Sequence, residues 1–324
     1  MDSSVNIRVR SNVSSPVISV IIPFYGEKND LFKCLGGLKK QNFIFEYEII
    51  VVESHSDPAT VELIKFSDKT TLISSDSLMY PGKARNLGIA SSTADLLAFI
   101  DADCVPELNW LPEIYSSLKR GYDIVIGPVL NLYPLHPIAS VDNLFLFTDF
   151  QKHPSLKNFH HFPGSNFGIT KELFYKAGKF PEDIQLAEDT LFSESALRKG
   201  KILFNKNVIV RHSGRKNFAG FKKHLESFGF YKGYLNLRSA PQNKLRRNYF
   251  FPVLLGLKRL AYITIRTLQW NPPGLFRIIF FFPFLMFGIS AWITGFRKGN
   301  RKFLSETGSG NSEIFLKDSG QGQA

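Results

Sequence analysis

Short apolar segments alternate with helical patterns over residues 17–127. Apolar, β-branched runs occupy residues 17–22, 48–52, 96–100 and 123–126. Between them, apolar positions recur at helical spacing in residues 30–40, 84–90 and 110–119. Continuous apolar strands separated by helices are typical of a mostly parallel sheet that is buried on both faces. We therefore expect an α/β fold with a mostly parallel sheet flanked by helices.

Acidic side chains follow two of these predicted strands. Glu53 comes after residues 48–52, and Asp101 and Asp103 come directly after residues 96–100. In parallel sheets, ligands bind at the carboxyl ends of the strands. Two carboxylates separated by one residue suit a hard divalent ion that keeps positions open for phosphate oxygens. An Asp-x-Asp sequence in a solvated turn is the simpler alternative for this pair.

Regular patterns return after an aromatic, irregular stretch at residues 128–163. Residues 170–177 and 189–198 predict helices, and residues 202–204 and 208–210 predict strands. Glu188 and Asp189 stand at the start of a helix, where acidic residues complement the helix dipole. A carboxylate there can instead act as a general base on an acceptor hydroxyl. His212, after the last strand, is either a metal ligand or an ordinary surface histidine.

The C-terminal third contains two long apolar segments. Residues 278–296 carry no formal charge and reach the length of a membrane-spanning helix, with a buried core helix as the alternative. Residues 250–270 place cations on one side of a predicted helix and leucines on the other, which is typical of a helix in a membrane interface. A surface helix of a soluble domain would give the same pattern.

Charge and cysteine content narrow the class of partner and the compartment. The 324 residues carry 40 Lys and Arg against 28 Asp and Glu, a net charge of +12, and much of the excess lies after Lys201 among apolar stretches. Because no nucleic-acid-binding module is recognisable, we expect an anionic membrane surface rather than nucleic acid as the partner. Two cysteines exclude a disulfide framework and favour a reducing compartment. Residues 1–15 are polar and lack the pattern of a signal peptide.

Together, these patterns predict four regions and a location. Residues 1–15 are expected to be a disordered tail, 16–235 the α/β domain and 236–304 a membrane-associated helical region. Residues 305–324, rich in Gly, Ser and Gln, are expected to be disordered. The predicted location is the cytoplasmic face of a cell membrane, with either peripheral attachment or one or two C-terminal membrane segments.

Seven short segments, taken in order, resemble the successive signatures of family 2 glycosyltransferases. The resemblance covers residues 17–233, and its ordered set of motifs is specific although each motif is degenerate. It implies a GT-A fold and transfer of a sugar from a nucleotide-sugar to a hydroxyl group. The segments are VIIPFY at 20–25, EIIVVES at 48–54, ARNLG at 84–88, LAFIDAD at 97–103, GSN at 164–166, AED at 187–189 and VRH at 210–212.

The resemblance also implies a role for each matching residue. Asp103 and His212 match metal contacts for Mn²⁺ or Mg²⁺, and Asp189 matches the catalytic base of an inverting transfer. The processive Gln-x-x-Arg-Trp motif is absent after Asp189, which favours transfer of a single sugar. The positions assigned to the UDP- or GDP-sugar donor are Pro23, Tyr25, Glu27, Glu53, Arg85 and Asp101, and those assigned to the side of a sugar, lipid-linked or other hydroxyl acceptor are Gly164, Ser165, Asn166 and Glu188.

Three alternatives in other functional classes fit the sequence less well. A nucleotide-dependent oxidoreductase or nucleotidyltransferase would carry a glycine-rich loop after the first strand, where this chain has Phe24-Tyr25-Gly26-Glu27. A non-catalytic membrane scaffold that retains the fold would be expected to have lost at least one of four residues. All four are present: Asp101, Asp103, Asp189 and His212.

Overall fold

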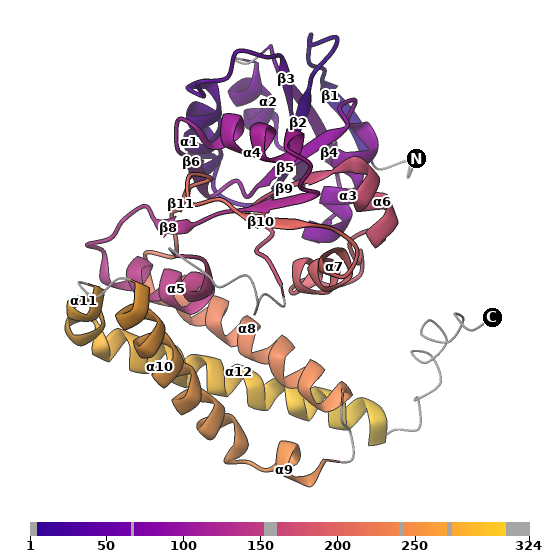
Figure 1. The fold of residues 1–324 in the computed structure, drawn as a ribbon. Coiled ribbons are helices and arrows are strands. Elements are labelled where there is room, and N and C mark those ends of the chain that lie inside the picture. Colours follow the sequence, from indigo (N-terminus) through magenta and orange to yellow (C-terminus); the bar gives the residue numbers. More distant parts are fainter. Residues whose placement is uncertain (1–4, 66–67, 152–160, 240–242, 271–273, 309–324) are drawn as a thin grey trace. The chain divides into compact units, whose positions relative to one another are not determined.

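The computed structural model describes residues 5–65, 68–151, 161–239, 243–270 and 274–308 (Figure 1). They form two compact units, which are described separately. The first comprises Met1–Leu135 and Leu146–Gly214, and the second His136–Phe145 and Arg215–Ala324. The expected boundary at residue 235 is wrong, because it falls inside helix α8 (Phe218–Arg238), which belongs entirely to the second unit.

An eight-stranded sheet forms the centre of the first unit (Figure 1). Strands β3, β2 and β5 correspond to predicted apolar runs and are parallel, as expected. β4, which was not predicted, is parallel to β3, whereas β9 runs antiparallel between β5 and β7. The strands, in spatial order, are β1 (Val5–Val9), β4 (Thr70–Ser75), β3 (Tyr47–Ser54), β2 (Ile18–Phe24), β5 (Leu96–Ile100), β9 (Asn166–Thr170), β7 (Ile124–Ile126) and β10 (Ile202–Phe204).

Strand β1 corrects the expectation of a disordered N-terminal tail. Val5, Ile7 and Val9 alternate with Asn6 and Arg8, which is the period-two pattern of a strand. This segment pairs antiparallel with β4 at the sheet edge, with Ile7 opposite Ile73. Residues 5–9 are therefore ordered, while residues 1–4 lie outside the described part of the chain.

Helices cover both faces of this sheet. Gly168 of β9 faces α4 (Trp110–Lys119), where the missing side chain leaves room for Ile114. The neighbouring Phe167 points to the opposite face and stacks on Phe99 at a ring distance of 4.3 Å. On that same face, Gly88 of α3 lies against Ile21, the sheet partner of Phe99. The helices of the first unit are α1 (Lys28–Lys39), α2 (Pro58–Ile64), α3 (Pro81–Ser91), α4, α6 (Lys171–Ala177) and α7 (Glu188–Leu197).

The first unit also contains a second sheet, which has three strands. It contains β6 (Cys104–Pro106), β11 (Val210–His212) and β8 (Val129–Asn131), in that spatial order. β11 pairs antiparallel with β6, which places His212 opposite Cys104. The residue before Cys104 is Asp103, so this register brings two predicted metal contacts together.

The second unit contains helices that pack through glycine. α8 and α12 (Phe282–Gly308) each contain a Gly-x-x-x-Gly sequence, at 229–233 and 295–299. A Cβ on Gly229 would lie 2.0 Å from the Trp292 carbonyl oxygen, and one on Gly295 would lie 1.9 Å from the Glu226 carbonyl oxygen. The two backbones therefore touch, as small residues allow. The remaining helices are α9 (Lys244–Arg247), α10 (Phe251–Trp270), α11 (Gly274–Phe280) and part of α5 (Pro137–Phe147).

The C-terminal helices differ from the predicted ones in extent. The apolar segment 278–296 is divided between α11 and α12 rather than forming one helix. Among the described residues, no single helix has the length and composition to cross a bilayer. The pair of α11 and α12 meets both criteria jointly but bends by 74°. Residues 305–308 belong to α12, so that part of the expected disordered tail is wrong, and residues 309–324 lie outside the described part.

Gly168→Ala tests the packing of α4 on the sheet. Its Cβ would lie 2.4 Å from Ile114 Cγ2 and 2.9 Å from Val125 Cγ1. We expect a loss of about 1–3 kcal/mol in the free energy of unfolding from overpacking, measured by urea denaturation. Gly36→Ala is the control, because its Cβ would meet no heavy atom within 4 Å and alanine favours a helix. Equal stability of the two variants would contradict this packing.

Candidate active site

The predicted donor residues lie where neighbouring parallel strands end. Tyr25 and Glu27 follow β2, and His55 follows β3, the strand beside it. The Tyr25 side chain is 68% exposed, and its ring centre lies 5.8 Å from that of His55. Pro23 lies inside β2, which continues two residues beyond the predicted apolar run at 17–22. Pairing with β5 ends at Ile21, so beyond that point β2 has one partner strand and tolerates the missing N–H.

Glu53 is placed differently from an exposed contact for a nucleotide base. Its side chain is buried, and Oε2 accepts a hydrogen bond from Ser74 Oγ at 2.9 Å. The same oxygen also lies 3.4 Å from the Asp57 amide nitrogen. These contacts tie the ends of β3 and β4 to the start of α2, so Glu53 has a clear structural role.

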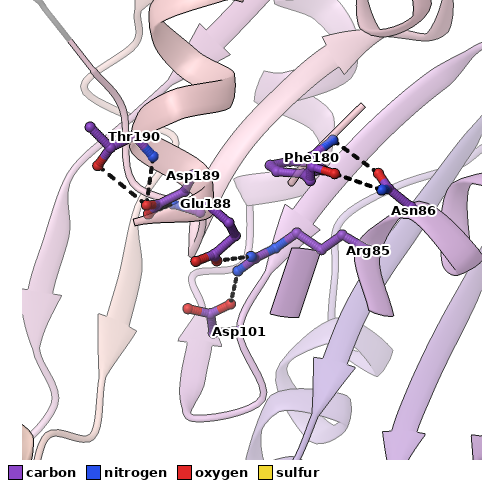
Figure 2. Close-up of polar contacts among 8 residues, drawn as sticks. Arg85, Asn86, Asp101, Phe180, Glu188, Asp189 and Thr190 are labelled. Carbon is purple, nitrogen blue, oxygen red and sulfur yellow. Dashed lines mark hydrogen bonds and ion pairs between the residues drawn. The ribbon is translucent and has the colours of Figure 1, made fainter. Parts of the chain in front are cut away.

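Arg85 of α3 links two acidic segments that are distant in sequence (Figure 2). Its NH1 group donates to Glu188 Oε1 at 2.5 Å, and its NH2 group donates to Asp101 Oδ1 at 2.8 Å. The guanidinium is buried, and so is the Glu188 carboxylate. This cation therefore joins the end of β5 to the start of α7.

Burial and charge alter the pKa values of all three groups. Burial raises the pKa of Glu188 to about 7, against the opposing attraction of Arg85. Burial also raises the pKa of Asp101, and Asp103 and Asp189 add to that effect. For Arg85, burial lowers the pKa of the guanidinium, but the neighbouring carboxylates outweigh it and keep the group charged. A cation surrounded by carboxylates in a desolvated position is typical of a functional site.

Asp189 is held in position by backbone N–H groups. Its Oδ2 accepts a hydrogen bond from the Gly164 amide at 2.9 Å, and its Oδ1 accepts one from the Thr190 amide at 2.7 Å. Glycine at position 164 leaves room for the guanidinium, because a Cβ there would lie 2.7 Å from Arg85 NH2. The predicted base and the predicted acceptor-side glycine are thus brought together beside Arg85.

A second set of contacts, which the sequence analysis did not identify, fixes the approach to α7. Asn86 donates a hydrogen bond to the Phe180 carbonyl and accepts one from the Phe180 amide (Figure 2). It also donates to Glu182 Oε1. Gly82, one helical turn earlier, lets the Pro181 carbonyl approach to where a Cβ would be 2.0 Å away. Asn86 directly follows Arg85 in the ARNLG motif, and that adjacency was the available sequence signal.

Backbone strain also occurs at the edges of the site. Ala187, immediately before Glu188, has φ of 73°, and His55 has φ of 60°. Residues other than glycine rarely adopt this left-handed backbone conformation, and such strain is concentrated at functional sites. At Ala187 it turns the chain so that α7 begins with Glu188 and Asp189.

Asp103 and His212 form a second polar pair. His212 Nε2 lies 3.3 Å from Asp103 Oδ2, and the His212 ring packs edge-on against Phe147 at 5.0 Å. A backbone hydrogen bond also joins the two segments, because the Ser213 amide donates to the Asp103 carbonyl. Among the described residues, no group of three or more His, Cys, Asp or Glu side chains is arranged to hold a metal ion.

Two residues predicted for the acceptor side have distinct environments. The Ser165 hydroxyl is buried and makes no hydrogen bond within the described chain. Asn166 has no exposed surface. It accepts from Trp110 Nε1 and donates to the carbonyls of Pro128 and Val208. Asn166 is therefore a structural residue that joins β9 to two neighbouring segments, which corrects its predicted contact with an acceptor.

The raised pKa of Glu188 predicts a specific pH dependence of stability. Between about pH 4.5 and about pH 7 the folded chain retains a proton that the unfolded chain has released, so the free energy of unfolding falls as pH rises. Glu188→Gln removes this titration and keeps an oxygen for Arg85. In urea denaturation across this range, the stability of the original chain should fall relative to Glu188→Gln. Glu62→Gln, at an exposed position, should leave the pH dependence of the original chain unchanged. If stability varied with pH in parallel for all three proteins, the pKa of Glu188 would not be raised.

Comparison with known proteins is consistent with this geometry. Residues 19–178 match the model of Glycosyl transferase family 2. The chain is 30% identical to glycosyltransferase AglE of Haloferax volcanii over 72% of this chain and 77% of that protein. It is 24% identical, over 87% of this chain and 96% of the relative, to a Methanococcus voltae enzyme. That enzyme is dolichyl N-acetyl-alpha-D-glucosaminyl phosphate 3-beta-D-2,3-diacetamido-2,3-dideoxy-beta-D-glucuronosyltransferase.

Two solved structures share the fold. The mannosyltransferase PcManGT from Pyrobaculum calidifontis, in complex with GDP-Man and Mn²⁺, has a TM-score of 0.55 and 17% identity, covering 91% of this chain and 90% of that one. S. aureus TarS 1-349 in complex with UDP-GlcNAc has a TM-score of 0.51 and 16% identity, covering 89% and 91%. The expected GT-A fold is confirmed. From motif order, site geometry and these matches together, the chain belongs to glycosyltransferase family 2 and is a glycosyltransferase enzyme.

Proposed function

We propose that the chain transfers a single sugar from a nucleoside-diphosphate sugar to an acceptor hydroxyl with inversion, using Asp189 as general base. The carrying observation is that Arg85 draws Asp101 and the Glu188–Asp189 pair to one place (Figure 2). The acidic end of β5 and the acidic start of α7 therefore face a common site. With a divalent ion bound, the end of β5 suits the anionic diphosphate of a donor, and the start of α7 suits an acceptor hydroxyl.

The orientation of Asp189 supports its role as the base. Its two oxygens are directed by separate backbone amides, so rotation of the carboxylate would break a hydrogen bond. A fixed carboxylate can remove the acceptor proton as the hydroxyl oxygen attacks the anomeric carbon. The bond from that carbon to the diphosphate breaks in the same step, and the electron pair leaves with the diphosphate.

The pair of Asp103 and His212 fits a divalent ion with few protein ligands. An oxygen and a nitrogen ligand converge here, and Mg²⁺ and Mn²⁺ commonly use one or two side chains together with phosphate oxygens and water. Such an ion, when bound, would stabilise the negative charge that develops on the diphosphate. Among proteins with this fold, PcManGT was solved with Mn²⁺, which supports the assignment.

The donor and acceptor classes follow from the relatives. The two structures of similar fold contain GDP-Man and UDP-GlcNAc, so a GDP- or UDP-sugar is the proposed donor. The Methanococcus voltae relative acts on a dolichyl phosphate-linked sugar. We therefore propose a lipid-linked sugar hydroxyl as the acceptor.

Asp189→Asn should lower turnover by ~10²–10⁴-fold, the usual contribution of a general base. Nucleoside diphosphate release would be measured from a panel of nucleotide sugars, with membrane lipid extract as the acceptor source. Asp76→Asn makes the same chemical change at an exposed position and should retain full activity. Near-normal turnover of Asp189→Asn would exclude it as the base.

Asp103→Asn should raise the Mn²⁺ concentration for half-maximal activity by at least ~10-fold. Loss of a residue that only supports a metal ligand commonly lowers metal affinity by that factor, and loss of a direct ligand should cost at least as much. Chelator should abolish activity of the original chain, and added Mn²⁺ should restore it. Full activity in chelator, or an unchanged Mn²⁺ requirement in Asp103→Asn, would remove the proposed metal role.

A further inference from the structure

Helix α10 exposes the side that its sequence marks as apolar. Leu254, Leu257, Ile265 and Leu268 are 60%, 53%, 53% and 44% exposed and lie in one stripe along the helix. Another side, which includes Ile263, is buried within the second unit. A helix that only covers a soluble core would direct its leucines inward.

The exposed apolar surface continues across the next turn of the chain. α11 contacts both α10 and α12, and its Ile278 is buried in the core of the second unit. Three other apolar side chains of α11 are exposed: Phe276 is 77% exposed, Ile279 64% and Phe280 82%. Phe282, at the start of α12, is 46% exposed. We call these eight residues the apolar surface: Leu254, Leu257, Ile265, Leu268, Phe276, Ile279, Phe280 and Phe282.

The segment of the chain that carries the apolar surface has formal charges of a single sign. Residues 227–305 contain thirteen of the 40 Lys and Arg of the chain and none of its 28 Asp and Glu. The rest of the chain therefore has 27 basic against 28 acidic residues, and the entire positive excess lies in this segment. Lys258 and Arg277 are exposed on the same helices as the apolar side chains.

We propose that the apolar surface inserts into an anionic lipid bilayer, with the surrounding cations bound to lipid headgroups. Apolar side chains gain by leaving water for hydrocarbon, and cations beside them gain from negative headgroups. A second copy of the chain would bring cations against cations. A nucleic acid would satisfy the cations but would leave an aliphatic stripe without a partner. The bilayer satisfies both features.

The test is flotation of the full chain with phosphatidylcholine vesicles that contain or lack phosphatidylglycerol. Binding to the anionic vesicles is expected. Phe276→Ser/Phe280→Ser should weaken it by at least ~10-fold, because two exposed aromatic side chains no longer enter the hydrocarbon. Lys258→Gln and Arg277→Gln should each weaken binding by about fivefold, and only with anionic vesicles.

A matched pair of variants separates insertion from general stickiness. Ile279→Ser lies on the apolar surface, and Ile44→Ser makes the same change at a residue of the first unit that is 90% exposed. Only the former should lose affinity. Equal affinity of the two variants, no binding to anionic vesicles, or a change in oligomeric state of Phe276→Ser/Phe280→Ser without lipid would overturn the proposal.

Insertion and catalysis can fail independently. Asp189→Asn should bind vesicles as tightly as the original chain, because flotation does not depend on turnover. Phe280→Trp should be quenched by brominated lipids more than the original chain is, which reports entry into hydrocarbon. Absence of this added quenching would overturn insertion and leave the proposed sugar transfer untouched.

Discussion

The buried Arg85 guanidinium holds the active site of the first unit together. Its ion pairs with Asp101 and Glu188 join the end of a central strand to the start of α7. Removing one partner of a buried ion pair commonly costs about 3–5 kcal/mol, because the other charge remains without compensation. The neighbours of these carboxylates, Asp103 and Asp189, occupy their positions through the same two anchors.

Close backbone contacts around Arg85 make this arrangement rigid. Gly82 and Gly164 are sites where a Cβ would collide with the Pro181 carbonyl and with Arg85 itself. Asn86 fastens the segment that leads to α7, and Ala187 accepts an unfavourable backbone conformation at its start. Close backbone packing and ion pairs together therefore fix the site, which explains how the Asp189 carboxylate keeps one orientation.

The second unit depends on a different balance. Backbone contact between α8 and α12 through glycine leaves their bulky side chains to pack elsewhere or to face solvent. The apolar surface on α10 and α11 lies outside this core, in a segment without acidic residues. The glycine contact between α8 and α12 and the exposed apolar side chains of α10 and α11 are both compatible with the proposed insertion into a bilayer.

Apolar runs and the polar residues that follow them are local features, so the parallel core of the sheet and the residues at its strand ends could be predicted from the sequence. The order of the family motifs likewise predicted Asp101, Asp103, Asp189 and His212 as one site. Which of these groups form ion pairs could not be predicted, because Arg85 and Glu188 are 103 residues apart in the chain and meet only in the folded protein. The tertiary structure also decided that Asn166 is buried and that the second unit begins before α8. The alternation of apolar and polar residues in β1 is visible in the sequence, but its order depends on β4, whose paired residues lie 63 or more positions away in the chain. The local spacing of apolar residues defines the helices and strands, whereas burial and charge interactions between distant parts of the chain decide which of these elements lie next to each other.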